Sequence, residues 1–410
     1  MSNPASTLAS PRSQFILVLL IAGCSIAALS FGPRAALGLF LSPMSDANGW
    51  GRDVFALALA IQVLLWGAAQ PVAGAIADRF GPVLVLSGGA ILYAVGLWLM
   101  AYSTSPAMLT ISAGVFMGFG IAGSSFTIVL AAFGKLLPPE WRSLAFGAGT
   151  AAGSFGQFLF SPLAVGLMHG FGWQMALVLF GVIVLLVIPL SLVLATPKDF
   201  VAPNTPKQSL REALSEAMGH RSYVLLVLGF FTCGFQLLFI TVHLPAYVVD
   251  RGLSVDIGAW TIGVIGLFNI AGSLLAGWLG DKMPKRYLLA IIYFLRSAAV
   301  LAFISFPVTP ATSIVFGAVM GLLWLSTVPP TSGLVAIMFG TRWFATLFGV
   351  AFFSHQVGGF LGVWLGGVLY EAFGSYDPIW WGSIAFGIVS ALLHLPIVEK
   401  PVVRAAAAAA

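Results

Sequence analysis

Long apolar stretches constrain the fold of this chain more than any other feature. A helix needs about 20 mainly apolar residues to cross the hydrocarbon core of a bilayer, and polar or proline-containing breaks divide the sequence into twelve stretches of that length. They lie near residues 15–41, 53–77, 83–102, 107–137, 142–169, 173–195, 222–249, 257–280, 286–306, 311–339, 343–370 and 378–398. The sequence therefore predicts an all-α membrane protein with twelve transmembrane helices.

Composition excludes the other fold classes. Hydrophobic residues make up 60% of the 410 residues and charged residues only 8%, whereas an ordinary soluble domain has about 25% charged residues. The mean hydropathy of +1.03 indicates that most side chains face a medium other than water, which excludes a soluble globular protein. A transmembrane β-barrel is excluded because its strands alternate in polarity over about ten residues, and these stretches are continuously apolar.

Several classes of function are excluded in the same way. The net charge of +5 and pI of 9.4 do not indicate a nucleic-acid-binding protein, because the basic residues are scattered between apolar stretches and do not cluster on one exposed face. Cys24 and Cys233 lie far apart in apolar stretches, so neither a disulfide framework nor a metal site is expected. No Gly-x-x-x-x-Gly-Lys nucleotide loop occurs. We therefore expect a protein that is not an enzyme and that uses no metal, cofactor or ATP.

One long polar segment, residues 197–221, separates the sixth apolar stretch from the seventh. It divides the chain into an N-terminal unit at 1–196 and a C-terminal unit at 222–404, which is followed by an alanine tail at 405–410. The first apolar stretch is too long for a signal peptide and has no A-x-A cleavage site, so we expect it to remain as the first membrane helix.

The distribution of basic residues predicts the orientation in the membrane. If both termini lie inside, fourteen Lys and Arg residues fall in the inner loops and tails, and only Arg52 and Arg251 fall in the outer loops. The positive-inside rule then places both termini and the 197–221 linker in the cytoplasm. We expect a multi-pass protein of a bacterial cytoplasmic membrane.

The two halves of the sequence repeat each other. Residues of the same type recur at separations of 202 or 203 positions: Gly74 and Gly277, Asp78 and Asp281, Pro43 and Pro245, Gly147 and Gly349, and Gly156 and Gly358. A six-helix unit that is duplicated in parallel predicts two bundles around an axis normal to the membrane, with a substrate site between them.

Residues 74–81, which read Gly-Ala-Ile-Ala-Asp-Arg-Phe-Gly, resemble the loop between helices two and three of the major facilitator superfamily of secondary transporters. Residues 277–282 are a weaker copy of it, and the resemblance covers about residues 15–400. It implies the major facilitator fold of two six-helix bundles, transport of a small molecule by alternating access, and a monomer. It also implies that the two loops act as a conformational latch, the alternative being loops that only turn a tight corner. The residues of this predicted latch are Gly74, Asp78, Arg79, Gly277, Asp281 and Lys282.

The segment 32–44 in the first helix is similar to the monocarboxylate and oxalate–formate exchanger branch of that superfamily. Members of the branch commonly hold the substrate carboxylate with an arginine in helix eight, and residues 267–272 contain no arginine here. Helix five also lacks the Gly-Pro-x-x-Gly-Gly run of drug–proton antiporters, which argues against drug export.

Arg34 is the leading candidate for a substrate-binding residue. A charged side chain near the bilayer centre costs about 2.5–3.5 kcal/mol on insertion scales, so it indicates a function. A guanidinium offers paired N–H donors to a carboxylate. The 202-residue offset relates Arg34 to Gln236, which predicts that the two face each other across one cavity. The alternative is that Arg34 reaches outward to the membrane surface or pairs with backbone carbonyls beside Pro33.

The other candidates are polar residues in later helices. Arg296 lies midway along the ninth stretch, where it either hydrogen-bonds inside the C-terminal bundle or contacts substrate. His355 either lines the cavity, where protonation could couple to transport, or is a buried hydrogen-bonding histidine. The remaining candidates either line the cavity or hydrogen-bond between helices, and they are Gln157, Asn269 and Gln356.

The acidic residues decide the sign of the substrate's charge. All thirteen Asp and Glu residues fall at the predicted membrane surfaces and none in the middle of a stretch. A proton-coupled carrier of cations or sugars would ordinarily need a buried carboxylate, and this interior is instead positive. We therefore expect a secondary transporter of a small organic anion, a mono- or dicarboxylate, driven by proton symport or by antiport of a counter-anion. The alternatives are efflux of amphipathic drug-like compounds and a transport-inactive membrane receptor.

The orientation can be tested by cysteine labelling. A cysteine at Ser209, in the linker, should react with a membrane-impermeant maleimide only after the cells are opened, and a matched cysteine at Ser254, in a predicted outer loop, should react in intact cells. Labelling of the Ser209→Cys variant from outside intact cells would overturn the charge argument.

Overall fold

The computed structural model describes residues 11–195, 209–340 and 343–402. Its helices follow the predicted apolar stretches, and the all-α fold class is confirmed. The helices of the N-terminal half are α1 (Pro11–Ala35), η2 (Leu37–Phe40), α2 (Leu41–Asn48), α3 (Arg52–Phe80), α4 (Pro82–Ala101), α5 (Pro106–Leu109), η3 (Thr110–Phe116), α6 (Met117–Gly123), α7 (Phe126–Leu136), α8 (Pro139–Val184) and α9 (Val187–Leu192).

The C-terminal half begins with a short helix that was not predicted from the sequence. This helix, α10, lies in the polar linker and is started by a capping box between Ser209 and Glu212. The rest of the linker, 197–208, lies outside the described residues. The helices of this half are α10 (Leu210–Gly219), α11 (Arg221–Asp250), α12 (Val255–Lys282), α13 (Lys285–Ser305), α14 (Pro310–Leu323), α15 (Val328–Phe339), α16 (Phe344–Phe373) and α17 (Asp377–His394).

Ten stretches of the described residues are long and apolar enough to cross a membrane. One of them, Gly147–Leu192, contains both the fifth and the sixth predicted spans, because the chain bends at Gly172 with a φ of 80° that favours glycine. The shorter α17 packs beside α13 as the twelfth span. The described residues thus contain the twelve spans of the prediction, arranged as two six-helix bundles.

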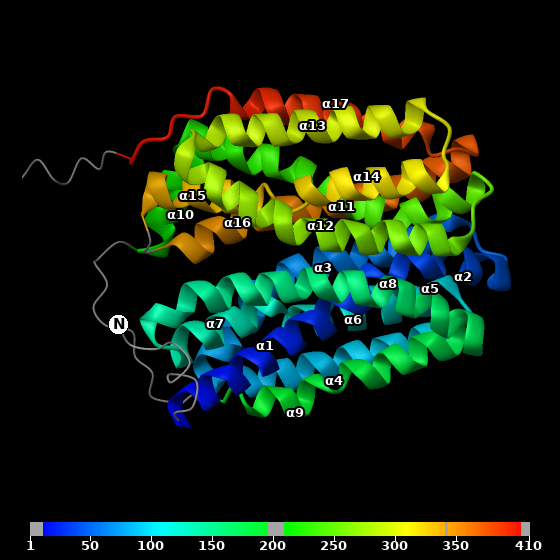
Figure 1. Ribbon diagram of the computed structural model, residues 1–410, viewed down its shortest axis with the longest axis horizontal. Coiled ribbons are helices and arrows are strands. Elements are labelled where there is room, and N and C mark those ends of the chain that lie inside the picture. Colours follow the sequence, from blue (N-terminus) through cyan, green and yellow to red (C-terminus); the bar gives the residue numbers. More distant parts are fainter. Residues whose placement is uncertain (1–10, 196–208, 341–342, 403–410) are drawn as a thin grey trace, which may run out of the picture.

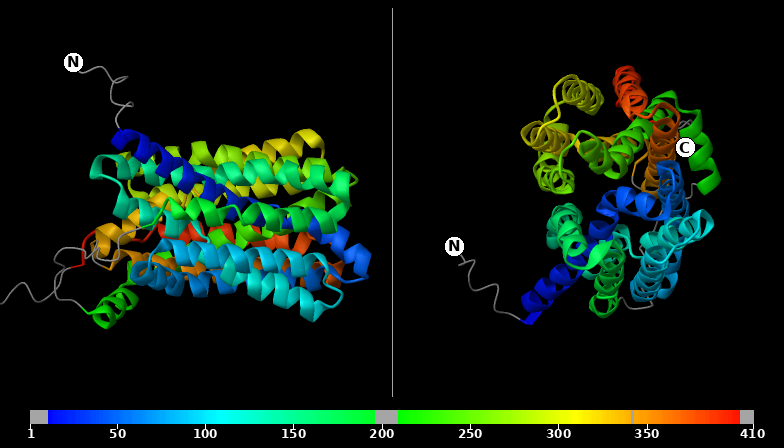
Figure 2. Two further views of the ribbon diagram at one scale, coloured as in Figure 1. Left: turned by 90° about the horizontal axis from the view of Figure 1, so that it is seen from below. Right: turned by 90° about the vertical axis from the view of Figure 1, so that its right-hand side faces the viewer.

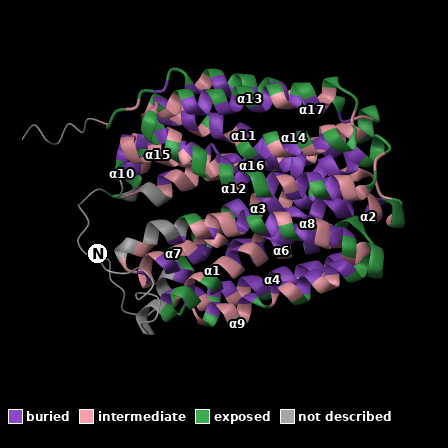
Figure 3. Cartoon of the chain, viewed as in Figure 1, coloured by how far each residue is buried: buried purple, intermediate pink, exposed green. Residues whose placement is uncertain are grey.

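The two bundles lie side by side, with all spans roughly along one axis (Figure 1), and the view down that axis separates them (Figure 2). We call the end at which α3 passes into α4 the linker end, and the end at which α2 passes into α3 the Arg52 end. Exposed residues recur along the outward-facing helices of both bundles (Figure 3). Many are large and apolar, such as Leu84, Trp278 and Phe294, as expected for a surface that contacts lipid.

Two predicted spans are not continuous helices. The fourth, predicted as one helix over 107–137, contains the π-helical segment η3 and breaks at Ser124 and Ser125. The hydroxyl of Ser30 on α1 donates to the carbonyl of Ser124, which satisfies one of the backbone groups that the break leaves unpaired. The break therefore depends on a side chain from another helix.

The tenth span, predicted as one helix over 311–339, breaks between α14 and α15. Pro329 and Pro330 lie in the first turn of α15, where a missing N–H group is tolerated, whereas α14 could not continue through them because neither has an N–H group to donate to the preceding turn. The offset of 202 relates Ser124 and Ser125 to Ser326 and Thr327, so the two breaks are equivalent positions of the repeat.

The bundles contact each other mainly along two helix pairs, α3 with α16 and α8 with α12, and α11 also contacts η2 and α2. In the first pair, the Gln356 amide donates to the carbonyl of Val63 over 3.2 Å. In the second, the Gln157 amide donates to the carbonyl of Ile262 over 3.0 Å. Alternating access requires such contacts to break on one side at a time.

Arg52 closes the interface at the Arg52 end. Its guanidinium, from the first turn of α3, forms two hydrogen bonds of 2.6 Å with the carboxylate of Asp250 on α11. It also donates to the Tyr376 hydroxyl over 3.1 Å and lies 4.0 Å from the centre of the Tyr370 ring. Its backbone N–H donates to Glu371 over 2.7 Å. A cation of the N-terminal bundle is thus held by carboxylates and rings of the C-terminal bundle.

The linker end is packed differently. Four glycines of the repeat, Gly74, Gly147, Gly277 and Gly349, lie in the halves of α3, α8, α12 and α16 nearest this end. A Cβ atom built on any of them would meet no atom within 4 Å. The helix pairs that touch farther along therefore leave space at these glycines.

We predict that Arg52→Gln shifts the protein toward a conformation that is open at the Arg52 end, because it removes the bidentate ion pair across the interface. The reactivity of a cysteine at Thr241, which packs against Gly38 of the other bundle, toward a membrane-impermeant maleimide should rise several-fold. The matched control is Arg251→Gln, since Arg251 pairs over 3.5 Å with Asp377 of its own bundle. Equal reactivity in both variants would show that Arg52 does not hold this end shut.

Candidate functional site

Arg34 lies in the last turn of α1, directly after Pro33. Only 7% of its surface is exposed. The guanidinium carbon lies 4.7 Å from the centre of the Trp66 ring and 6.0 Å from that of Phe31. The described residues supply no carboxylate and no hydrogen-bond acceptor to this guanidinium, and its Nε atom is buried without a partner. A buried cation without an anion is costly, so this group is suited to an anionic ligand.

Aromatic rings connect Arg34 to His355 across the bundle interface. The Trp66 ring, under the guanidinium, meets Phe352 of α16 edge to face with 5.8 Å between centroids. The Phe352 ring stacks on the His355 imidazole at 5.6 Å and an interplanar angle of 7°. Phe230 of α11 also packs on His355, with 5.1 Å between the ring centroids. The structure thus brings two predicted site residues, Arg34 and His355, to opposite ends of one aromatic cluster.

The hydrogen bonds of His355 define its tautomer. The Nε2 of Gln356 donates to the carbonyl of Val63, so the amide oxygen is the atom that faces His355. That oxygen lies 3.0 Å from Nδ1 of His355 and can only accept. Nδ1 therefore carries a hydrogen. The imidazole also lies beside the Cys233 thiol.

Arg296 is completely buried inside the C-terminal bundle. Its Nε and Nη2 atoms donate to the carbonyl of Leu323 over 2.9 and 2.6 Å, and Nη2 also donates to Trp324. These carbonyls belong to the end of α14, which the helix break leaves without intrahelical donors. The structure thus places Arg296 at the break in the tenth span, away from Arg34.

Gln236 does not face Arg34. Its amide donates to the carbonyl of Ser383 on α17 over 2.9 Å, so the side chain points into the C-terminal bundle. The repeat offset places the two backbones at equivalent positions but does not determine the direction of their side chains.

The remaining predicted residues lie where α8 meets α12. Gln157 donates across this contact to Ile262, and Asn269 donates to the Ser154 hydroxyl over 2.9 Å. The amide oxygen of Asn269 also accepts from the backbone N–H of Leu325, at the break in the tenth span. These residues join the bundles to each other and to the helix break.

Trp66 and Gln70 belong to the surroundings of Arg34 but were not predicted as site residues. The Trp66 indole donates to Gln70 over 2.9 Å, and the Gln70 amide donates to Ser125 over 2.7 Å and to Thr127. Gln70 interrupts an apolar stretch, a signal that was available in the sequence. From the sequence alone, Trp66 is expected to be a packing residue. A lone tryptophan in a membrane helix does not indicate which residue it contacts.

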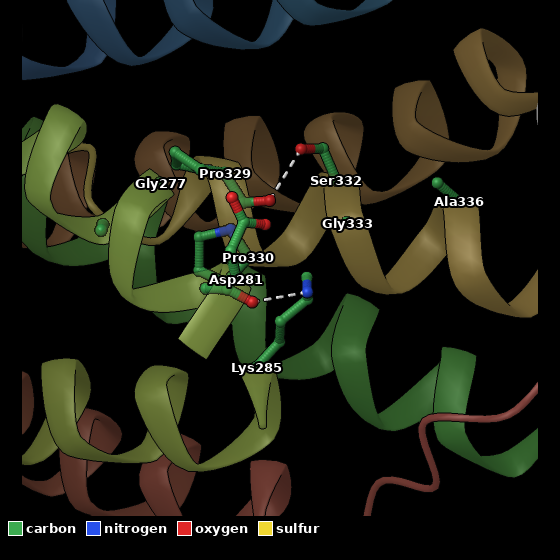
Figure 4. A pocket seen from close by; sticks show the side chains of 10 residues that line it. Gly277, Asp281, Lys285, Pro329, Pro330, Ser332, Gly333 and Ala336 are labelled. Carbon is green, nitrogen blue, oxygen red and sulfur yellow. Dashed lines mark hydrogen bonds between the residues drawn. The ribbon is translucent and has the colours of Figure 1, made fainter. Parts of the chain in front are cut away.

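The predicted latch lies at the linker end. Gly277 and Asp281 line a cavity of about 310 Å³ between α12 and α15, next to Lys285, which donates to the carbonyl of Gly280 over 2.7 Å (Figure 4). Lys282 lies 4.1 Å from the centre of the Trp278 ring. The side chains of Asp78 and Arg79 lie outside the described part of the structure. Within that part, no cross-bundle ion pair involves Asp281 or Lys282.

Comparisons with known proteins agree with this architecture. The chain is 27% identical to YcxA of Bacillus subtilis (strain 168), described as an uncharacterized MFS-type transporter, over 95% of this chain and 97% of that protein. It is 28% identical to monocarboxylate transporter 13 of Rattus norvegicus over 85% of this chain and 81% of that protein.

Solved structures share the fold. A bacterial homologue of the human lysosomal transporter Spinster, in an inward-facing and occupied conformation, superimposes with a TM-score of 0.74 at 15% identity, over 94% of this chain and 97% of that one. A D-xylose–proton symporter superimposes with a TM-score of 0.70 at 16% identity, over 94% and 98%. The family model of the Major Facilitator Superfamily matches residues 23–363. The chain therefore belongs to the Major Facilitator Superfamily and is a multi-pass membrane transporter, not an enzyme.

Proposed function

We propose that this transporter carries a small organic anion, a carboxylate, by alternating access between its two bundles. The observation that carries the proposal is the Arg34 guanidinium, which is buried within the chain's first span without an acceptor among the described residues. A carboxylate accepts two parallel hydrogen bonds from a guanidinium and neutralises its charge. A cationic or neutral substrate would leave the buried charge uncompensated.

The name of the rat relative agrees with a carboxylate. That protein is a monocarboxylate transporter, and its similarity to this chain extends over most of both chains. An identity of 28% supports the proposed substrate class without specifying the substrate.

Two features support alternating access. The Arg52 cluster joins the bundles at one end, and the four repeat-related glycines leave space at the other. Closing the linker end would bring α3 toward α16 and α8 toward α12 at glycines, where backbones can approach closely. The predicted latch residues would then meet the opposite bundle. We further propose that the linker end faces the cytoplasm of a bacterium, as the basic residues indicate.

The driving force is proposed to be either proton symport or anion exchange. Two ring contacts, Trp66 with Phe352 and Phe352 with His355, connect His355 to the surroundings of Arg34. The neighbours of His355 on α16, Phe352 and Gln356, contact Trp66 and Val63 of the N-terminal bundle, so His355 is linked to that bundle through them. Protonation of this imidazole would place a second positive charge at the interface, where it would favour an anion.

We predict that Arg34→Lys weakens carboxylate binding about tenfold or more, because an ammonium cannot reproduce the paired donors of the guanidinium. Arg34→Gln should weaken binding further by removing the charge. The measurement is the Kd of butyrate for purified protein in nanodiscs, with the thermal unfolding of each unliganded variant as the control for folding.

The two outcomes of this series are distinct. A folded Arg34→Gln variant with an unchanged Kd would make the guanidinium structural and would contradict the proposal. Flux of amphipathic amines into proteoliposomes, without binding of any carboxylate, would instead favour the efflux alternative.

A further inference from the structure

We infer that the site selects monocarboxylates that carry an aromatic ring, so that the carboxylate lies on Arg34 and the ring lies against the aromatic cluster. This inference rests on the proposed function and makes its substrate class more specific. It follows from the number of charges at the site, the rings beside them and the space opposite.

The charges indicate a substrate with one negative charge. Arg34 and Arg296 are the two arginines in the middle of predicted spans. Arg296 points to the carbonyls of Leu323 and Trp324 inside the C-terminal bundle, so its charge does not lie beside Arg34. One free guanidinium balances one carboxylate, and the second carboxylate of a dicarboxylate would be desolvated without a fixed cationic partner.

The rings beside Arg34 form a wall from both bundles. Phe31 and Trp66 of the N-terminal bundle flank the guanidinium at 6.0 and 4.7 Å. Phe352 of the C-terminal bundle continues the wall, edge to face against Trp66 at 5.8 Å. An aromatic ligand can make the same offset and edge-to-face contacts, which favour a ring over an aliphatic chain of similar size.

The rings of the wall are not repeated at the equivalent positions of the other half. The offsets of the repeat relate Trp66 to Asn269, Phe352 to Thr150 and His355 to Gly153. These counterparts on α12 and α8 are small or polar, so rings at these positions are not a packing requirement of the fold. The α8–α12 side has a ring contact of its own, Phe158 with Trp260 at 6.4 Å, and the wall differs from it by lying beside Arg34.

Gly153 leaves room for a side-chain atom beside Phe31. A Cβ atom on Gly153 would meet only Phe31, at 3.8 Å or more. By contrast, Gly156, one turn further along α8, already contacts the backbone of Ala28 on α1. The residue that corresponds to His355 is thus a buried glycine whose Cβ position is unfilled, next to the same phenylalanine that flanks Arg34.

The test is a comparison of four acids by their Kd for the protein in nanodiscs: phenylacetate, cyclohexylacetate, butyrate and succinate. We expect phenylacetate to bind about tenfold more tightly than butyrate and several-fold more tightly than cyclohexylacetate, which has a ring of similar size without a π face. Succinate should bind most weakly. Each acid should be measured at constant pH and ionic strength.

Variants of the protein test where the ring of the ligand binds. Phe352→Leu should reduce the ratio of phenylacetate to butyrate affinity about fivefold. The matched control is Phe360→Leu on the same helix, whose ring packs on Trp364 instead, and this variant should keep the ratio. Gly153→Leu should fill the space opposite and lower phenylacetate affinity more than butyrate affinity, and it provides an independent test should Phe352→Leu unfold.

The outcomes separate this inference from the proposed function. If butyrate or succinate binds as tightly as phenylacetate, the aromatic selectivity is refuted while carboxylate transport stands. The aromatic selectivity would also be refuted if Phe352→Leu and Phe360→Leu reduced the ratio of phenylacetate to butyrate affinity equally, because the effect would then be general to α16. If no carboxylate binds, both fail together.

Discussion

A bilayer supplies no water to a buried polar group, and this constraint explains where the polar residues of this transporter lie. The break in the fourth span is capped by Ser30, and the break in the tenth is capped by Arg296 and Asn269. In each case a neighbouring helix provides the donor or acceptor that the interrupted helix lacks. Breaks of this kind let a span bend while the cost of exposing backbone groups to lipid stays low, which suits the proposed alternating access.

Arg34 lacks such a partner among the described residues, and the proposed function rests on it. Arg296 donates to carbonyls, and Arg52 donates to Asp250, whereas the described part of the chain gives Arg34 the faces of two aromatic rings and no carboxylate. A cation–π contact offsets part of the desolvation cost, about 2 kcal/mol when the pair is desolvated, and leaves the N–H donors available. A carboxylate would stabilise this site by neutralising the guanidinium, at the interface where the proposed mechanism separates the bundles.

The twelve spans could be predicted because apolar length acts locally, and the predicted boundary between the fifth and sixth spans falls at the Gly172 bend. Pro329 and Pro330 were a local signal of the tenth break that the prediction of one helix over 311–339 did not use, whereas the fourth break depends on Ser30 from another helix. Arg34 was found because a charge in an apolar stretch is conspicuous. Trp66 and Phe352 were not, since only tertiary packing brings their rings to Arg34, and Arg52 was counted as a loop charge because its partners lie about 200 or more residues away. Gln236 was placed by symmetry, which relates backbones but does not fix side-chain directions.

We propose that an anion on Arg34 shifts the equilibrium between a conformation open at the linker end and one open at the Arg52 end. Spin labels on cysteines at Leu84 and Tyr287, repeat-related and exposed at the linker end of each bundle, would report that balance by pulsed electron–electron double resonance in a Cys24→Ser background. Saturating phenylacetate should change the distance distribution of the parent protein and leave that of Arg34→Gln unchanged. The same change in Arg34→Gln, or no change in the parent with any bound carboxylate, would contradict the account.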